Sequence, residues 1–485
     1  MTDVLVVGAG PTGLTLACVL ARQGVSVRIV DRSPSAQPGS RGFTVKPRTL
    51  EVFDDLGIAD RFMAAGWVAA RTRVHLGGSL LADFSIGQDK PSATRPYPNS
   101  LALPQFKTEE ILRDRLADFG VRVEFGTGVR DFQANAGGVV VELDTGESAQ
   151  VSYLVGCDGG RSTVRKRLGL RFSGRTEEDV QVLLADAYVE GLAHSNATQI
   201  WLGADTFVAR PSGEGGRWQL VASVPPDHPE PSARLLEKLA RERTGLDLRL
   251  VDPNWLSVWR YHLRMVDTYR VGPVFLAGDA AHVHSPFGAF GMNTGVQDAD
   301  NLGWKLGWVL RGHADDGLLD TYEQERLPVA RAVLAESDRT FSTAARPPAF
   351  LRPLLPLLVR PYLTRLNKRG RYDHPSYPDS SLSVGPGAGV SAPDGRYGTG
   401  RLFDLYRGSH LTVLAFGQPL DQFALYGPAV RGYSVDSADI RRAYGVRPGT
   451  FVVIRPDGYI GAVVREVADL TAYLDRTLSL HLVDR

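Results

Sequence analysis

The chain opens with two apolar-rich runs separated by a longer amphipathic stretch. Val4–Val7 and Val25–Val30 are rich in valine and isoleucine, as buried strands are. Between them, Pro11–Gln23 carries apolar residues three or four positions apart, which predicts a helix. The first 31 residues therefore predict a strand, a helix and a second strand, the unit from which open parallel sheets are built.

The turn between the first strand and the helix is rich in glycine. It reads Gly8-Ala9-Gly10-Pro11-Thr12-Gly13, a G-x-G-x-x-G whose glycines permit a tight turn, room for a pyrophosphate and close helix–strand packing. Asp31 ends the second strand, where a carboxylate can bind ribose hydroxyls, and Arg32 follows it. The unit predicts a dinucleotide site, and the acid at Asp31 suits an unphosphorylated ribose, as in FAD or NAD.

Two later strands also end in a carboxylate and glycines. Val151–Gly156 runs into Cys157-Asp158-Gly159-Gly160, and Val274–Ala277 runs into Gly278-Asp279. Ligands of open α/β sheets bind beyond the carboxyl ends of strands. A loop from Pro286 to Gly291 then leads into a helix that Asn293 or Thr294 can cap, and its N-terminus favours an anion. One apolar face of this helix is expected to be buried: Val296, Ala299, Gly303, Leu306 and Leu310.

The pattern changes twice further along the chain. Residues 176–259 contain strand-like runs and one helix, Ser232–Arg243, and predict a mainly antiparallel sheet inserted into the first unit. Residues 346–400 are rich in Pro, Gly, Ser and Arg, and strand–helix alternation resumes after them. The expected domains are a dinucleotide-binding domain (1–71, 99–175 and 260–345), a sheet domain (72–98 and 176–259), a linker (346–380) and a small α/β domain (381–485).

Composition narrows the classes of function. The 485 residues are 43% hydrophobic and carry a net charge of +1, so no overall field attracts nucleic acid or an anionic membrane. The first strand follows Met1 so closely that we expect no signal peptide, and no apolar run approaches the ~18 residues of a membrane span. The two cysteines, Cys18 and Cys157, form no disulfide framework, and no Cys/His spacing predicts a metal. We expect a cytoplasmic protein without a metal, without a nucleic-acid partner and without stable membrane contact, and we leave a homodimer open.

Three motifs in order carry a family resemblance: GAGPTG at Gly8–Gly13, DGGRSTVR at Asp158–Arg165 and GDAAH at Gly278–His282. PRTLEVFDDLGI from Pro47 and NTGVQDADNLGWKL from Asn293 extend it. The chain resembles the FAD-dependent aromatic hydroxylases, the class A flavoprotein monooxygenases with the para-hydroxybenzoate hydroxylase fold. It is most similar to the branch that acts on polyketides, other aromatic natural products or antibiotics and carries a C-terminal thioredoxin-like domain. That domain would lack a CxxC here.

The resemblance implies an α/β fold, with a Rossmann-like FAD-binding domain, the inserted antiparallel sheet as substrate domain, and the thioredoxin-like domain. It implies FAD as cofactor and NADPH or NADH as co-substrate. Pro286 and Gly288 would border the flavin ring where the peroxide forms. On the sheet, Trp201, Phe207, Arg210 and Trp218 are candidates for lining the substrate site, although strand alternation cannot tell lining from core. The cofactor-binding positions implied are Gly8, Gly10, Pro11, Thr12, Gly13, Asp31, Arg32, Arg41, Gln105, Asp158, Gly278, Asp279, Pro286, Gly291, Met292 and Asn293.

The implied reaction is reduction of FAD by NAD(P)H, oxygen addition at C4a, and hydroxylation of an aromatic ring in a polyketide-like, polycyclic or phenolic substrate. Baeyer–Villiger oxygen insertion, epoxidation or dehydrogenation on the same fold stay open, as does a non-catalytic flavin-binding scaffold. One departure is Ala289-Phe290, where the family has a glycine and a polar residue, because alanine disfavours a positive φ. His262, His282 and His284 are candidate bases, but a histidine beside a flavin loop is more often structural.

Overall fold

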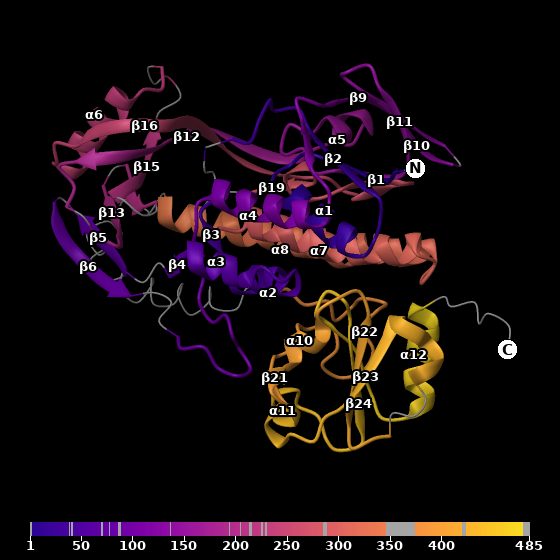
Figure 1. Ribbon diagram of the computed structural model, residues 1–485. Helices are drawn as coiled ribbons and strands as arrows, with labels where there is room; N and C mark the ends of the chain where they lie inside the picture. The colour runs from indigo at the N-terminus through magenta and orange to yellow at the C-terminus, as the bar shows by residue number, and fades with distance from the viewer. Residues whose placement is uncertain are drawn as a thin grey trace.

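A mainly parallel sheet forms the core of the first part of the chain (Figure 1). The computed structural model describes residues 2–478 except positions 38, 40–41, 69–70, 77, 86–88, 136, 194, 204, 213–215, 225–226, 228–229, 285–288, 346–373 and 420–422. The strand order is β17 (Arg270–Val271), β18 (Val274–Leu276), β11 (Ser148–Gly156), β1 (Thr2–Val7), β2 (Val27–Asp31) and β8 (Val123–Phe125). An antiparallel hairpin, β9 (Val129–Asn135) and β10 (Gly138–Leu143), pairs with β11.

The carboxyl ends of β1, β11 and β18 meet at one edge of this sheet. The three strands are parallel, and Val7 pairs with Gly156, which in turn pairs with Leu276. The residues that follow these positions are the glycine-rich turn, Asp158 and Asp279. The three sequence motifs therefore come together in space, as their places at strand ends predict.

Helices pack against this sheet and against one another (Figure 1). They are α1 (Pro11–Arg22), α4 (Gln105–Asp118), α7 (Gly291–Leu310) and α8 (Asp320–Ala345). Two shorter helices, α2 (Pro47–Asp55) and α3 (Ala59–Ala65), and a small sheet of β3 (Thr44–Val45), β7 (Leu101–Ala102) and β4 (Trp67–Val68) complete this part of the chain. α7 packs so closely on α1 that a Cβ added to Gly303 would lie 2.7 Å from Val19 Cγ1. Among the described helices, none is long and apolar enough to cross a membrane.

The start of α7 differs from the sequence expectation. The helix begins at Gly291 with Phe290 as its N-cap, so neither Asn293 nor Thr294 is the cap. Asn293 lies inside the first turn, where Lys46 N–H and Thr49 Oγ1 donate to its side-chain oxygen at 2.8 and 2.7 Å. The side-chain amide is thus used by the neighbouring segment, which sequence spacing does not reveal. The expected apolar face is buried from Val296 to Leu306, while Leu310 is half-buried.

The inserted sheet has eight strands in the order β19 (His282–Val283), β16 (Arg249–Met265), β12 (Ser173–Glu190), β15 (Arg217–Val224), β14 (Phe207–Pro211), β13 (Ala197–Leu202), β5 (Arg71–Leu76) and β6 (Ser79–Ser85). Neighbours are antiparallel except β13 and β5. α6 (Ala233–Thr244), capped by Ser232, covers one face. The expected boundaries at 175/176 and 259/260 fall inside β12 and β16, so the two units share continuous strands.

The C-terminal part is a separate α/β unit (Figure 1). Its sheet has the order β23 (Val430–Ser434), β22 (Leu411–Phe416), β24 (Thr450–Ile454) and β25 (Ile460–Val464), with α10 (Leu402–Tyr406), α11 (Ala438–Ala443) and α12 (Val467–Thr477) around it. The turn Arg455–Gly458 joins β24 and β25 as an antiparallel hairpin. The thioredoxin-like assignment stays a prediction. Most of the expected linker lies outside the described residues.

A buried network of charges joins the C-terminal unit to α7 and α8. Arg455 makes two parallel hydrogen bonds to Glu325 of α8, at 2.6 and 2.9 Å. Lys305 of α7 donates to the same carboxylate at 2.8 Å, and Trp304 Nε1 donates to Asp457 at 3.0 Å. The charged side chains are at most 1% exposed. Two cations thus balance two anions in a site without water access, which fixes the position of α7.

Candidate active site

The glycine-rich turn has the backbone that its sequence requires. Gly8 has a φ of +105°, and a Cβ added there would collide with the carbonyl of Cys157. A Cβ on Gly13 would collide with the carbonyl of Gly8. Gly10, in contrast, has nothing within 4 Å of the place where a Cβ would lie. The first and third glycines therefore serve packing, and the second leaves open space at the N-terminus of α1, where N–H groups favour an anion.

Asp31 lies half-buried at the end of β2, beside that turn. Its Oδ2 accepts a hydrogen bond from Ala9 N–H at 2.7 Å, and its Oδ1 accepts one from Ser33 N–H at 2.8 Å. Each carboxylate oxygen keeps a further lone pair. Asp31 therefore holds the glycine-rich turn in place and can still accept a ligand hydroxyl. Arg32 next to it is exposed.

The third motif packs against Thr12 and leaves Asp279 exposed. Gly278 has a φ of +58°, and a Cβ there would lie 2.5 Å from Thr12 Oγ1. The same hydroxyl fills the space beside Gly295 of α7. The Thr12 side chain of α1 thus lies between the third motif and α7 and contacts both. Its neighbour Pro11 is buried as the first residue of α1. Asp279 is exposed, and its Oδ1 lies 3.9 Å from the place of a Cβ on Gly291, the first residue of α7.

The second motif is tied to the third. Asp158 Oδ2 accepts hydrogen bonds from the N–H groups of Thr163 (2.6 Å) and Val164 (3.3 Å) at the start of α5 (Thr163–Arg167). Arg165 donates to the carbonyl oxygens of Ala280 at 2.9 Å and of Gly160 at 2.8 Å. Asp158 Oδ1 is buried and lacks a hydrogen-bond partner among the described residues. Asp158 therefore binds the first N–H groups of α5, whose N-cap is Ser162, and its Oδ1 can accept a hydrogen bond from another group.

The N-terminus of α7 is strained and positively charged. Ala289 has a φ of +54°, the left-handed conformation that alanine disfavours. The Lys46 ammonium lies 3.6 Å from the centroid of the Phe290 ring, so the departure at Phe290 provides a cation–π contact in place of a polar group. The first N–H groups of α7, from Gly291 on, have no side-chain cap from the described residues. This end of the helix suits an anion.

Gln105 and Met292 meet at Gly42. Gln105 Oε1 accepts a hydrogen bond from Gly42 N–H at 2.8 Å, and Met292 Sδ lies 3.4 Å from the place of a Cβ on Gly42. The predicted positions Arg41, Pro286 and Gly288 lie outside the described residues.

Three buried side chains, Asp298, His282 and His284, form a chain of contacts beneath the third motif. The sequence alone does not predict these contacts. Asp298 of α7 lies 2.7 Å from His282 Nε2, and His282 Nδ1 lies 3.1 Å from His284 Nε2. Asp298 also accepts hydrogen bonds from Arg326 Nε at 2.7 Å and from Gly278 N–H at 3.1 Å. No local spacing links residue 298 to residues 282 and 284, because the contact depends on how α7 folds back over the sheet end.

The structure corrects three of the four substrate-lining candidates. Trp201, Phe207 and Trp218 are at most 4% exposed and belong to the hydrophobic cluster between the sheet and α6. Arg210 is on the opposite face, where its guanidinium lies over the ring of Phe43 in the FAD-binding domain, at 5.4 Å. Because side chains alternate along a strand, only Arg210 faces the cofactor side. The large aromatic residues serve as core.

Arg210 belongs to a row of polar residues across three strands. Arg210 pairs with Gln219, and Gln219 pairs with Asp186, so their side chains share the cofactor-side face. Within the described residues, Asp186 Oδ1 and Arg210 Nε are buried without a hydrogen-bond partner. Burial raises the pKa of Asp186 to about 6, although Arg210 and Arg217 oppose that rise. Buried polar atoms without a partner are rare, so this row is a candidate for ligand recognition.

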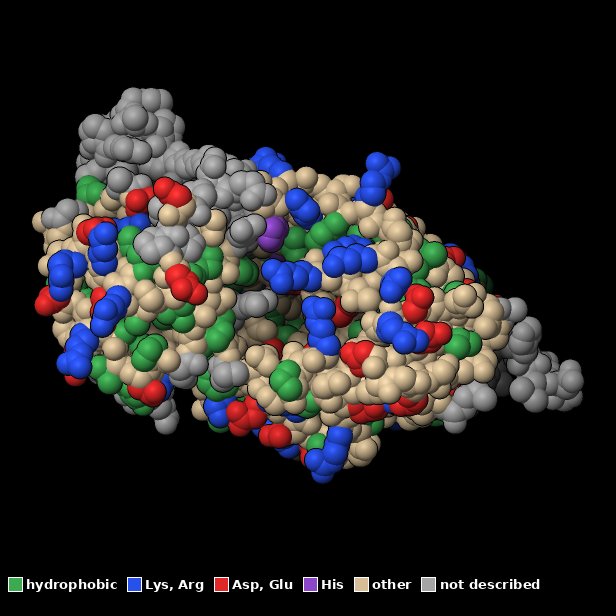
Figure 2. Space-filling model, turned by 90° about the horizontal axis from the view of Figure 1, so that it is seen from above, with side chains coloured by type: hydrophobic (Ala, Val, Ile, Leu, Met, Phe, Trp, Pro, Cys, Tyr) green, Lys and Arg blue, Asp and Glu red, His purple; other side chains and the backbone are tan. Residues whose placement is uncertain are grey.

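The face seen in Figure 2 is hollowed between the sheet domain and the FAD-binding domain, and basic side chains gather along the rim of the hollow. A rim of this sign suits the phosphate groups of a dinucleotide.

Comparison with known proteins decides the family. Residues 1–337 match the family model described as FAD binding domain. The chain belongs to the flavin-dependent monooxygenases. It is 40% identical to a flavin-dependent monooxygenase of Mycobacteroides abscessus, over 98% of this chain and 100% of the relative. It is 37% identical to a 6-methylpretetramide 4-monooxygenase of Streptomyces rimosus, over 99% and 94%. Its fold matches that of an aklavinone-11 hydroxylase solved with FAD and aklavinone, with a TM-score of 0.80, 28% identity and 99% of each chain covered.

The site of this flavin-dependent monooxygenase fits FAD. The open space at Gly10 admits a pyrophosphate, and Asp31 keeps lone pairs for ribose hydroxyls. Asp279 is exposed and lies beside the N-terminus of α7, which no side chain of the described residues caps. These groups lie along the joined carboxyl edge of the parallel sheet, where an extended dinucleotide binds.

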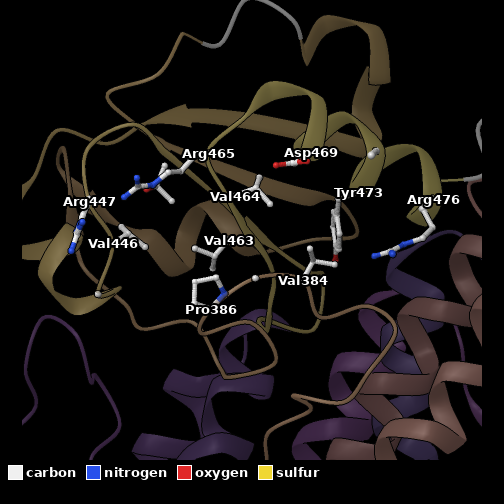
Figure 3. Close-up of a pocket in the computed structure, with 14 residues that line it drawn as sticks. Val384, Pro386, Val446, Arg447, Val463, Val464, Arg465, Asp469, Tyr473 and Arg476 are labelled. Atoms are coloured by element: carbon white, nitrogen blue, oxygen red, sulfur yellow. The ribbon is translucent and has the colours of Figure 1, made fainter.

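A second cleft of this monooxygenase lies in the C-terminal unit and is separate from the FAD site (Figure 3). It has a volume of about 720 Å³. Val463, Val464 and Pro386 lie along its middle, while Arg447, Arg465 and Arg476 lie towards its ends. None of the three motifs contributes to it.

Proposed function

We propose that this flavin-dependent monooxygenase hydroxylates a polycyclic or phenolic aromatic substrate, with NAD(P)H as reductant and O2 as oxidant. The polar row of Asp186, Gln219 and Arg210 on the cofactor side of the sheet supports this proposal most directly. Apolar neighbours such as Leu184 and Val221 pair beside it and offer an apolar surface to a ring. An aromatic compound with oxygen substituents at one edge matches both features, since rings pack on apolar surfaces and hydroxyl or keto groups satisfy Asp186 and Arg210. The related enzymes that act on 6-methylpretetramide and aklavinone support this substrate class.

Bound FAD supplies the electron transfer and the activation of O2. The chain's residues bind and orient it. We assign the turn that Gly8, Gly10 and Gly13 shape to the pyrophosphate, which the open space at Gly10 would receive. We assign Asp31 to the ribose and Asp279 to the ribityl chain. The N–H groups from Gly291 to Asn293 would face the end of the flavin that becomes anionic on reduction. The inserted sheet excludes water from the reacting ring, which limits loss of reducing equivalents.

The first test needs no substrate. Purified protein should be yellow, and NADPH or NADH should bleach it under anaerobic conditions. A colourless protein that cannot take up FAD would contradict the cofactor site.

The second test concerns the polar row. We expect Arg210→Met to raise the KM of an accepted substrate about 10- to 100-fold, because a hydrogen bond to a charged group contributes about 1.5–3 kcal/mol. FAD content should not change. Arg249→Met, at an arginine whose side chain is 77% exposed, is the matched control and should leave KM unchanged.

The third test concerns the pH dependence that Asp186 would cause. Substrate binding should tighten as the pH rises through about 6, the pKa of Asp186, because the ionised carboxylate accepts a phenolic hydrogen bond. Asp186→Asn should remove this dependence.

A further inference from the structure

The chain Asp298–His282–His284 has a defined proton arrangement. Arg326 and His282 hold the pKa of Asp298 below its usual value although burial opposes them, so this carboxylate is ionised. His282 Nε2 must then carry the proton that it shares with Asp298 at 2.7 Å. In a neutral imidazole the other nitrogen then carries a lone pair. His282 Nδ1 is therefore an acceptor.

The proton position on His282 determines which nitrogen of His284 carries a proton. Because His282 Nδ1 accepts, His284 Nε2 donates across the 3.1 Å contact. In a neutral imidazole the other nitrogen then carries a lone pair. His284 Nδ1 is that atom, and it is buried without a hydrogen-bond partner within the described part of the chain. The relay thus ends in an unused acceptor.

This acceptor lies at the cofactor site. A Cβ added to Gly291, the first residue of α7, would lie 3.7 Å from His284 Nδ1 and 3.9 Å from Asp279 Oδ1. His284 Nδ1 and the Asp279 carboxylate therefore approach the same point beside the helix N-terminus. A bound flavin would place its anionic end, once reduced, near this helix end.

The surrounding charges set the direction of the effect. Burial, His282 and Lys46 hold the pKa of His284 well below its usual value, so His284 is neutral before reduction of the flavin adds a negative charge. Tyr269 stacks on His282 at 6.0 Å between ring centroids and does not ionise near neutral pH, because burial raises its pKa well above the usual value. An anion added beside His284 favours its charged form.

We propose that Asp298, His282 and His284 form a proton relay that takes up one proton when the bound flavin is reduced. An N–H bond forms at His284 Nδ1 with a proton from solvent, and the proton of His284 Nε2 moves to His282 Nδ1. The positive charge then lies on His282, next to Asp298. The two electrons go from the reductant to the flavin, and reoxidation returns the proton to solvent. The relay rests on FAD binding and not on the identity of the substrate.

The test is the pH dependence of the flavin midpoint potential, measured on the FAD-bound protein by anaerobic titration with dithionite. Each proton coupled to a two-electron reduction changes the equilibrium constant tenfold per pH unit, or about 30 mV. With one proton on the anionic reduced flavin and one on the relay, we expect about 60 mV per pH unit near neutral pH. His284→Gln keeps a donor to His282 but cannot titrate, and should reduce the slope to about 30 mV. His313→Gln, outside the relay, should keep the wild-type slope.

Several results would overturn the relay. A wild-type slope of about 30 mV per pH unit would do so without any variant. An unchanged slope in His284→Gln would do so too. The absorption spectrum of the reduced wild-type protein gives an independent readout, because a neutral reduced flavin would mean that both protons are on the cofactor. If His284→Gln does not retain FAD, His282→Gln interrupts the same relay one step further away and should give the same lower slope.

Discussion

Arg455→Met should destabilise the contact of the C-terminal unit with α7 and α8. Arg455 makes two hydrogen bonds to Glu325 at 2.6 and 2.9 Å, and both side chains are fully buried. Removing one partner of a buried ion pair leaves the other charge uncompensated, which costs about 3–5 kcal/mol. Lys305 stays 2.8 Å from Glu325 and compensates that carboxylate in part, but buried Asp457 also loses its ion pair with Arg455, so we expect a loss of about 3–5 kcal/mol.

The assay is urea denaturation followed by tryptophan fluorescence. Trp304 reports on the contact directly, because its indole N–H donates to Asp457 at 3.0 Å. Arg401→Met is the matched control. Arg401 also joins the C-terminal unit to a carboxylate of the FAD-binding domain, Asp54, at 2.6 and 2.7 Å, but its side chain is 30% exposed. Water and salt screen such a pair, so its loss should cost about 1 kcal/mol or less.

The pH dependence gives a second check. Although burial opposes it, Arg455 and Lys305 hold the pKa of Glu325 well below its usual value. This carboxylate therefore contributes stability above its unfolded pKa of about 4.3, and the contribution is lost as the pH falls. The difference between Arg455→Met and wild type should shrink below about pH 4. Equal losses for Arg455→Met and Arg401→Met at neutral pH would refute the buried-network account.

Three further changes test the cofactor site. Ala289→Gly should stabilise the protein by about 1 kcal/mol, because it relieves a left-handed alanine, and a fall in Tm would contradict the strain. Gly278→Ala should reduce FAD content and stability, because its Cβ would meet Thr12 Oγ1 at 2.5 Å, whereas Gly24→Ala, with similar φ but open space, should cost only about 1 kcal/mol in thermal unfolding. Asp279→Ala should weaken FAD binding about 10- to 100-fold in fluorescence titration while circular dichroism is unchanged, and wild-type affinity would refute its role.

Much of the FAD-binding domain could be predicted from local pattern. The glycine-rich turn, the acid at Asp31 and the strand ends before Asp158 and Asp279 are all local signals, and parallel strands bring such ends to one edge. The family resemblance followed from the same motifs. Contacts between distant segments were not accessible in this way.

Two features show why the rest could not be predicted. Arg455 and Asp457 lie in the turn Arg455–Gly458, whose polar sequence is typical of an exposed loop. Both side chains are nevertheless buried, because the turn packs against α7 and α8. Trp201, Phe207 and Trp218 alternate with polar positions, and alternation does not tell which face α6 covers. In both cases the packing of separate units decides the role of the side chain.

We propose that this FAD enzyme transfers one oxygen atom from O2 to an aromatic substrate. The most direct measurement is mass spectrometry of the product formed from a polycyclic phenolic substrate, NADPH and 18O2. We expect one 18O atom on a ring carbon of the product, with substrate-stimulated consumption of NADPH. An oxidised product without label would contradict it and indicate a dehydrogenase on the same fold.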